Sequence, residues 1–231
     1  MTFEEYEAKR IRKREIAIRH LEAGVEFEDI DSVYIGEDVV IGEGTYIGPC
    51  VTLEGATVIG KNCRIYQNSR LSNAVIGDES KVTSSVLLDA AVGCGTEVGP
   101  FAYLRPGTKV GDHCKVGDFV EVKNSVIGDG TKAAHLTYIG DADVGKNVNF
   151  GCGVVFVNYD GTNKHRSTVG DGCFIGCNAN LVSPVIVGDG AYVAAGTTIT
   201  EDVPEDALCI GRSRQTVIEG WAEKRALYRK K

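Results

Sequence analysis

The sequence predicts an all-β solenoid, because aliphatic residues recur every six positions along much of its 231 residues. Three uninterrupted rows carry this period, over residues 35–71, 92–122 and 169–199. Glycine accounts for 29 residues, about twice its usual share, whereas aromatic residues make up only 7%. A six-residue period fits neither a helix nor an alternating strand. It fits a coil with three short flat faces, joined by tight corners.

Each aliphatic residue is expected to point inward and to stack on its equivalents in the coils above and below. Such a coil buries its apolar side only against its neighbours, and its narrow interior leaves little room for aromatic rings. About ten coils of ~18 residues would fit between residues 30 and 203. Glycine often follows the aliphatic residue, as at Gly42, Gly111 and Gly188, and we expect these glycines at corners with unusual backbone dihedrals. The alternative, a β-sandwich with irregularly spaced strands, does not explain three such rows.

Breaks in the repeat divide the chain into segments. Residues 1–24 are predicted to form a charged, linker-like helix, and residues 25–204 the β-helix itself. The polar, aperiodic segment near 157–168 is predicted to be an inserted loop, and long ordered loops often carry function. Residues 205–231 are expected to form a C-terminal arm with a second helix over 215–231. Either helix would cover an open end of the solenoid.

Composition excludes several classes of function. The net charge of −7 argues against a general nucleic-acid binder, and the basic run from Lys9 to Arg14 is read as a solvated helix face. No apolar run approaches the 18 residues of a membrane span, and the N-terminus lacks the features of a secretory signal. We therefore expect a cytoplasmic protein with neither nucleic acid nor membrane as partner. The eight cysteines are expected to be reduced, and the isolated histidines and cysteines indicate no metal site.

Five longer motifs point to a particular family, and they lie at residues 99–107, 117–123, 135–141, 158–161 and 193–198. Through them, residues 98–221 resemble the C-terminal acetyltransferase half of the bacterial bifunctional N-acetylglucosamine-1-phosphate uridyltransferase / glucosamine-1-phosphate N-acetyltransferase, in the hexapeptide-repeat acyltransferase superfamily. The resemblance implies a left-handed parallel β-helix that assembles as a homotrimer with active sites at subunit interfaces. Because no Gly-rich nucleotide loop precedes residue 30, we expect the uridyltransferase half to be absent.

The resemblance further implies transfer of an acetyl group from acetyl-CoA to the amine of glucosamine 1-phosphate, in the synthesis of UDP-N-acetylglucosamine for the cell envelope. The amine must be neutral to attack a thioester, and histidine is the side chain suited to accept its proton. His135, within the matching motif, is the candidate base, and Glu121 is expected to orient His135 or to help proton transfer. No metal is needed for this reaction.

The family's ligands map onto further residues. The sugar phosphate would meet Arg105 and Lys123, because a guanidinium fork and an ammonium both suit phosphate oxygens. Tyr138 and Asn149 match further sugar contacts, and Lys164 is expected to reach an anionic ligand across a subunit boundary. The acetyl-CoA contacts map to six positions: Cys152, Asn158, Tyr159, Cys177, Ala195 and Arg212.

Two of these positions depart from the family pattern, with Cys152 in place of a small alanine and Cys177 in place of serine. Both replacements are small, so the groove is expected to persist. Two other functions stay open: a transferase for a different amino sugar, and a non-catalytic trimeric scaffold. The sugar-site residues argue against the former, and His135 with the acetyl-CoA positions argues against the latter. A metal-dependent hydratase on the same solenoid would need convergent histidines that these spacings do not supply.

Overall fold

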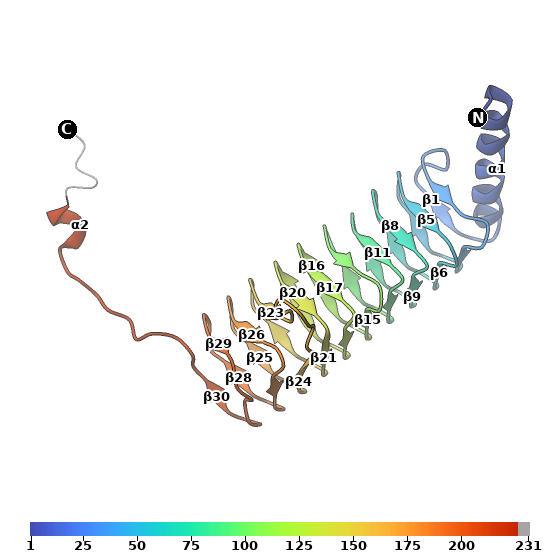
Figure 1. Cartoon of the computed structure of the whole chain (residues 1–231). Coiled ribbons are helices and arrows are strands. Elements are labelled where there is room, and N and C mark those ends of the chain that lie inside the picture. The colour runs from blue at the N-terminus through green and yellow to red at the C-terminus, as the bar shows by residue number, and fades with distance from the viewer. Residues whose placement is uncertain (226–231) are drawn as a thin grey trace.

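The protein is a left-handed parallel β-helix, as predicted, and a single helix lies at its N-terminal end (Figure 1). The structure is a computed structural model, and it describes residues 1–225. Each coil contributes one short strand to each of three parallel sheets. Within the described residues these sheets contain eleven, ten and nine strands, which correspond to the expected ten or so coils.

Within each sheet, the strands follow one another in space in the order of the chain. The first sheet contains β1 (Glu26–Phe27), β4 (Tyr46–Ile47), β7 (Arg64–Ile65), β10 (Lys81–Val82), β13 (Glu97–Val98), β16 (Lys115–Asp118), β19 (Lys132–His135), β22 (Asn149–Phe150), β25 (Phe174–Ile175), β28 (Tyr192–Val193) and β30 (Leu208–Cys209). The second contains β2 (Tyr34–Ile35), β5 (Thr52–Glu54), β8 (Arg70–Ser72), β11 (Val86–Leu88), β14 (Tyr103–Leu104), β17 (Glu121–Lys123), β20 (Tyr138–Gly140), β23 (Val155–Val157), β26 (Asn180–Val182) and β29 (Thr198–Ile199). The third contains β3 (Val40–Ile41), β6 (Val58–Ile59), β9 (Val75–Ile76), β12 (Ala91–Val92), β15 (Lys109–Val110), β18 (Val126–Ile127), β21 (Ala142–Val144), β24 (Ser167–Val169) and β27 (Ile186–Val187).

The six-residue rows form the core. Ile35, Leu53 and Leu71 are Cα partners in neighbouring coils of the second sheet, and all three are buried. The two largest interior side chains, Phe150 and Phe156, pack edge to face where the interior admits aromatic rings. In-register stacking of inward residues therefore accounts for the repeat, as the sequence predicts.

The reason expected for the repeat glycines is wrong at most of these positions. Gly42 and Gly188 do not have positive φ; instead, a Cβ on either would lie 2.5–2.6 Å from backbone atoms of the next coil. Among the glycines that follow a row residue, Gly99 does take a positive φ of 103°. Close approach of successive coils, rather than backbone freedom, is therefore the main requirement, and a side chain at Gly42 or Gly188 would force the coils apart.

Helix α1 (Phe3–Glu22) covers the N-terminal end of the solenoid. It begins with a capping box in which Thr2 and Glu5 satisfy each other's backbone N–H groups. Ile16 and Ala17 are buried against the core, and the remaining face is charged, as expected from the sequence.

The C-terminal arm differs from the helix expected over residues 215–231. Residues 213–218 have no regular structure, and helix α2 (Trp221–Lys224) has only four residues. Residues 226–231 of the expected helix lie outside the described part. The arm extends away from the solenoid (Figure 1), and residues 210–225 are exposed. Without an apolar surface to pack on, a short helix gains too little to offset the cost of nucleation.

Candidate active site

A row of equivalent positions runs along the corner between the first and second sheets, which we call the first corner. His135 ends β19, and the strand register places Cys152, Cys177 and Ala195 at the same point of the next three coils. All four side chains are exposed. One imidazole is thus followed along the solenoid axis by three small side chains. We call this exposed row of four residues the track.

His135 is held by a carboxylate from the preceding coil. Asp118 is its Cα partner in β16, and Asp118 Oδ1 lies 2.6 Å from His135 Nδ1. The hydrogen bond from His135 lowers the pKa of Asp118, so Asp118 is a carboxylate near neutral pH and can only accept. Neutral His135 then carries its proton on Nδ1 and keeps the Nε2 lone pair free, as a base requires.

Glu121, expected to orient His135, pairs with a different residue. Its Oε1 accepts a hydrogen bond of 2.8 Å from Arg105 Nη1 in the coil before it. This contact raises the pKa of Arg105, whose guanidinium also lies 5.9 Å from the ring centroid of Tyr103. Glu121 therefore orients the Arg105 guanidinium, whereas Asp118 orients the His135 imidazole.

A network of hydrogen bonds around Lys123 and Asp141 lies on the second sheet, one coil beyond Arg105. Lys123 Nζ is 2.9 Å from Asp141 Oδ2, and these side chains are only 17% and 9% exposed. Asp141 also accepts hydrogen bonds from Asn124, at 2.6 Å, and from Asn158, at 2.5 Å. Burial opposes both charges, but these hydrogen bonds outweigh it, so the pKa of Asp141 is lowered and that of Lys123 is raised. The ammonium is therefore charged and fixed in place.

The inserted loop occupies residues 158–166, between β23 and β24, and carries Lys164 to this network. The Lys123 ammonium lies beside Lys164 and lowers its pKa, and Arg105 adds to the same effect. Asn158 Nδ2 also lies 3.4 Å from the hydroxyl of Tyr138. Three cations thus converge at the second sheet in a chain whose net charge is −7. Such a cluster is suited to an anion.

A carboxylate at the tip holds the loop. Asp160 Oδ1 accepts from the backbone N–H groups of Asn163 and Thr162, and its Oδ2 lies 2.7 Å from Nε2 of His165. Together these bonds lower the pKa of Asp160 from 3.8 to about 2. At the loop's other end, both terminal nitrogens and Nε of Arg166 bind Asp143 and backbone carbonyls.

Replacing Asp160 with alanine is expected to loosen the loop without unfolding the solenoid. Because the pKa is lowered on folding, the ordering is complete above pH 3.8 and is lost as the pH falls towards about 2. Hydrogen exchange of residues 159–165 should therefore be faster in the variant at neutral pH. Thr162→Ala, which keeps the backbone N–H, is the matched control. Equal protection in the variant and the wild type would show that the carboxylate does not order the loop.

The remaining candidates lie in different places. Arg212 donates to the carbonyl of Ala195, at the end of the first-corner row. Tyr159 donates to the carbonyl of Gly161 within the loop. Asn149 begins β22 on the exposed face of the first sheet, whereas Arg105 and Lys123 lie along the second. One chain therefore brings most of the candidates to two adjoining surfaces and leaves Asn149 on the other side of the corner.

Sequence reasoning missed two residues, Asp118 and Asp141. Both lie within the family motifs, at 117–123 and 135–141, but their roles depend on which coil stacks on which. Asp118 precedes His135 by 17 residues, which is one coil shortened by a five-residue step. Counting that step would have placed the two side chains together.

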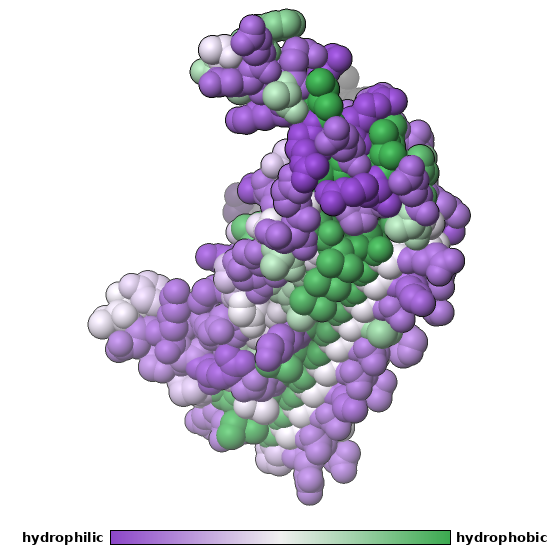
Figure 2. Space-filling model, turned by 90° about the vertical axis from the view of Figure 1, so that its right-hand side faces the viewer, coloured by the Kyte–Doolittle hydropathy of each residue, from purple (hydrophilic) through white to green (hydrophobic). Residues whose placement is uncertain are grey.

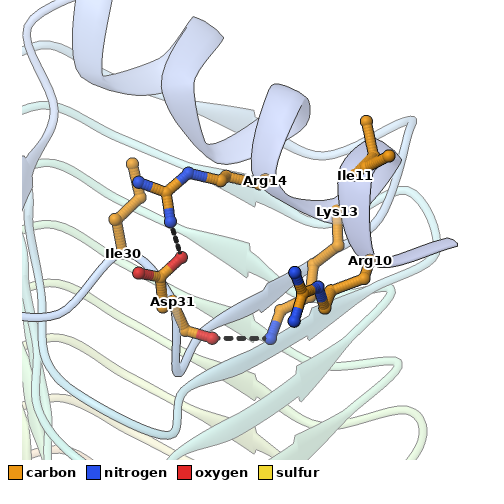
Figure 3. Close-up of a pocket in the computed structure, with 6 residues that line it drawn as sticks. All are labelled: Arg10, Ile11, Lys13, Arg14, Ile30 and Asp31. Carbon is orange, nitrogen blue, oxygen red and sulfur yellow. Dashed lines mark hydrogen bonds and ion pairs between the residues drawn. The ribbon is translucent and has the colours of Figure 1, made fainter. Parts of the chain in front are cut away.

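A separate groove of about 510 Å³ lies at the N-terminal end, between α1 and the turn at Ile30. Two of its basic side chains are already bound to Asp31: Arg14 pairs with the carboxylate, and Lys13 Nζ donates to the Asp31 carbonyl at 2.9 Å (Figure 3). It lies away from β19, so it is not the candidate site. Among residues 1–225, no group of three or more His, Cys, Asp or Glu side chains is placed to hold a metal ion. Within the same residues, neither helix combines the length and apolar character that crossing a bilayer requires.

The chain matches known bacterial proteins through these same coils. Residues 89–124 and 166–201 match the family model described as bacterial transferase hexapeptide (six repeats). The chain is 55% identical to the bifunctional protein GlmU of Clostridium beijerinckii over 221 residues. This alignment covers 96% of the chain and 49% of that protein. It is 56% identical to the GlmU of Acetivibrio thermocellus over 223 residues, and this alignment covers 96% of the chain and 48% of that protein. The chain thus spans about half the length of the curated relatives it matches.

A solved structure agrees on the fold. An Arabidopsis UDP-N-acetylglucosamine acyltransferase superimposes with a TM-score of 0.58 at 17% identity, over 77% of this chain and 69% of that one. At this identity the likeness concerns the β-helix alone. The sequence relatives are much closer, and their matches run through the coils that hold His135 and the three cations.

Proposed function

Because the chain belongs to the bacterial hexapeptide-repeat transferases and matches half of the bifunctional GlmU proteins, we propose that it is a glucosamine-1-phosphate N-acetyltransferase. It moves the acetyl group of acetyl-CoA to the sugar amine and forms N-acetylglucosamine 1-phosphate. One observation carries this proposal: His135, held by Asp118, stands at the head of the small-residue track, three residues before β20 in the sheet that carries Lys123.

The chemistry follows from that arrangement. The free Nε2 of His135 takes a proton as the amine nitrogen attacks the thioester carbonyl, and a C–N bond forms. The tetrahedral intermediate then collapses, the C–S bond breaks, and the imidazolium returns the proton to the leaving thiolate. Asp118 stabilises the imidazolium in between, because its carboxylate faces Nδ1 at 2.6 Å. No metal is needed in any of these steps.

The two ligands would occupy the two adjoining surfaces. Arg105, Lys123 and Lys164 supply the positive charge that a sugar phosphate needs, and Tyr138 offers a hydroxyl beside them. The acetyl-CoA arm would lie along the track, whose side chains beyond His135 are small, with Arg212 at its far end on the Ala195 carbonyl. The turn between β19 and β20 separates the two surfaces, so the thioester and the amine would meet near His135.

Assembly as a homotrimer would complete the site. Asn149 lies on the first sheet, so it reaches a sugar bound at Arg105 only if it comes from a neighbouring copy. An apolar stripe runs along the solenoid in Figure 2, and the third sheet exposes Val40, Val58 and Val75, each at least 40% accessible. Such a continuous apolar surface is typical of an interface. Sedimentation equilibrium distinguishes a trimer from a monomer.

The decisive experiment follows thiol release from acetyl-CoA with glucosamine 1-phosphate and with other amino sugars as acceptors. Turnover that requires glucosamine 1-phosphate supports the proposal. Turnover only with another amine indicates a different acceptor, and no turnover with any amine indicates a scaffold. Product is identified by mass, so that simple hydrolysis of the thioester is not counted as transfer.

Replacing Lys164 with alanine is expected to raise KM for glucosamine 1-phosphate by about tenfold, the effect of losing one charge-assisted hydrogen bond. Because Lys164 is exposed, thermal stability should not change. Steady-state kinetics with each substrate varied gives the result. Lys146→Ala removes an exposed lysine that pairs with Asp129 and serves as the control. An unchanged KM would place the phosphate elsewhere.

A further inference from the structure

Two cysteines are stacked in the track. β22 and β25 pair in register, with Asn149 opposite Phe174 and Phe150 opposite Ile175, and the same register places Cys152 opposite Cys177. The backbone confirms the continuation, because the N–H of Asn178 donates to the Cys152 carbonyl at 2.8 Å. Both thiols are free and exposed.

Cys177 lies close against the coil that holds Cys152. A Cβ placed on Gly151 would lie 2.5 Å from the backbone nitrogen of Cys177 and 2.9 Å from its Sγ, so the two coils approach closely beside Cys152. Neighbouring strands lie about 4.8 Å apart, which falls inside the window of about 4.4–6.8 Å that disulfides span between Cα atoms. Both residues lie in a turn rather than in a strand, where small adjustments do not break the ladder.

This pair is the only stacked pair among the eight cysteines, all of which lie within residues 1–225. Cys63 and Cys114, for example, are buried and stack on threonines of the preceding coils, Thr45 and Thr96. Exposed Cys94 lies between β12 of the third sheet and β13 of the first, and its backbone N–H donates to Asp112 Oδ1 of the next coil. Sequence spacing alone conceals the pair, because the inserted loop separates its members by 25 residues.

We propose that Cys152 and Cys177 form a reversible intrachain disulfide, with hydrogen peroxide or a related peroxide as the oxidant. One thiolate attacks a peroxide oxygen, the O–O bond breaks, and a sulfenic acid forms while the released hydroxide takes up the thiol proton as water. The second thiol then attacks the sulfenic sulfur, the S–S bond forms and the S–O bond breaks, which releases a second water. Two thiols are thereby oxidised and one peroxide is reduced.

The bond closes the track to acetyl-CoA, and this consequence rests on the proposed function. Cys152 and Cys177 lie between His135 and Ala195, so a disulfide there fixes the middle of the surface on which the thioester arm would lie. Side chains on parallel in-register positions must converge to bond, and strained, exposed disulfides are readily reduced. The modification therefore acts as a reversible block on the site, released by thiols.

Peptide mapping tests the bond independently of activity. The full chain is treated with hydrogen peroxide, alkylated and digested with chymotrypsin, which cleaves after Phe150, Phe156, Phe174 and Tyr192 and so separates the two cysteines from all others. A cross-linked peptide that loses two hydrogens and disappears with dithiothreitol is expected. Cys177→Ser should abolish it and Cys94→Ser should leave it intact. Free thiols, separate sulfinic acids, or a cross-link between two chains would overturn the proposal.

Activity tests the consequence. The oxidised wild type should lose most of its thiol release from acetyl-CoA and regain it with dithiothreitol. Cys177→Ser, compared with its own untreated activity, should resist peroxide, and Cys94→Ser should stay sensitive. Bound acetyl-CoA should also protect the two thiols from cross-linking. A cross-link in a protein that is inactive before oxidation would contradict the proposed function and leave the disulfide standing, whereas full activity with the bond formed would refute the block.

Discussion

Replacing His135 with alanine is expected to lower kcat for acetyl transfer by about 10² or more, the usual contribution of a positioned general base. The loss should fall on kcat rather than on KM, because the imidazole meets the proton during the reaction and holds neither substrate in the ground state. Asp118→Asn should have a smaller effect in the same direction, since it removes the charge that stabilises the imidazolium and introduces an NH2 group that can donate to Nδ1 and favour the wrong tautomer.

Thiol release at saturating substrate measures both variants. His113→Ala is the matched control, because His113 is also exposed at a corner, between the third and first sheets, and it precedes β16 whereas His135 lies opposite the end of that strand. Thermal melts of the variants should coincide with that of the wild type, since His135 is exposed and its loss leaves the core unchanged. A His135→Ala variant with near-normal kcat would exclude this residue as the base and would remove the main support for the proposed site.

Gly117→Ala should destabilise the protein by about 3 kcal/mol, the upper part of the range for overpacking. Gly117 is buried in β16, and a Cβ there would lie 1.9 Å from the Ala134 carbonyl oxygen and 2.6 Å from its carbon. Neither backbone atom can move aside without separating the two coils. Because Asp118 and His135 are the next residues on these coils, the substitution should also disturb their hydrogen bond and reduce turnover.

Denaturant unfolding monitored by far-UV circular dichroism gives the change in stability. Gly36→Ala is a fitting control, because Gly36 also follows a row residue, yet a Cβ there would meet its nearest atom at 3.5 Å, an ordinary contact. This control should unfold close to the wild-type midpoint. If both variants were equally stable, close approach between coils would not be the reason for glycine at these positions.

The rows of Ile35, Leu53 and Leu71 made the fold predictable from sequence, because each coil repeats the same inward position. The repeat alone did not show which residues of neighbouring coils stack on His135 or on the two cysteines. Their alignment depends on the lengths of intervening coils, which the five-residue steps and the loop change. Resemblance supplied the handedness and the ligand assignments, and spacing alone would not have done so.

The C-terminal segment shows where sequence reasoning failed. The residues around Trp221 have helical composition, but the described arm touches no apolar surface that would stabilise a helix. Composition gives a local preference, whereas stability depends on a packing partner. The partner of Glu121 was hidden for a related reason, since its contact with Arg105 follows from strand register, which its spacing from His135 did not reveal.

The in-register pairing of successive coils makes the molecule modular along its axis. Adding one complete turn of ~18 residues ahead of β13 would lengthen the protein by about 4.8 Å and leave every downstream neighbour unchanged. An insertion of odd length within a strand would instead turn buried side chains toward solvent. Whole-turn insertion or deletion in residues 26–92 should therefore be tolerated, so the distance from α1 to the chemistry can vary among relatives while the chemistry itself stays fixed.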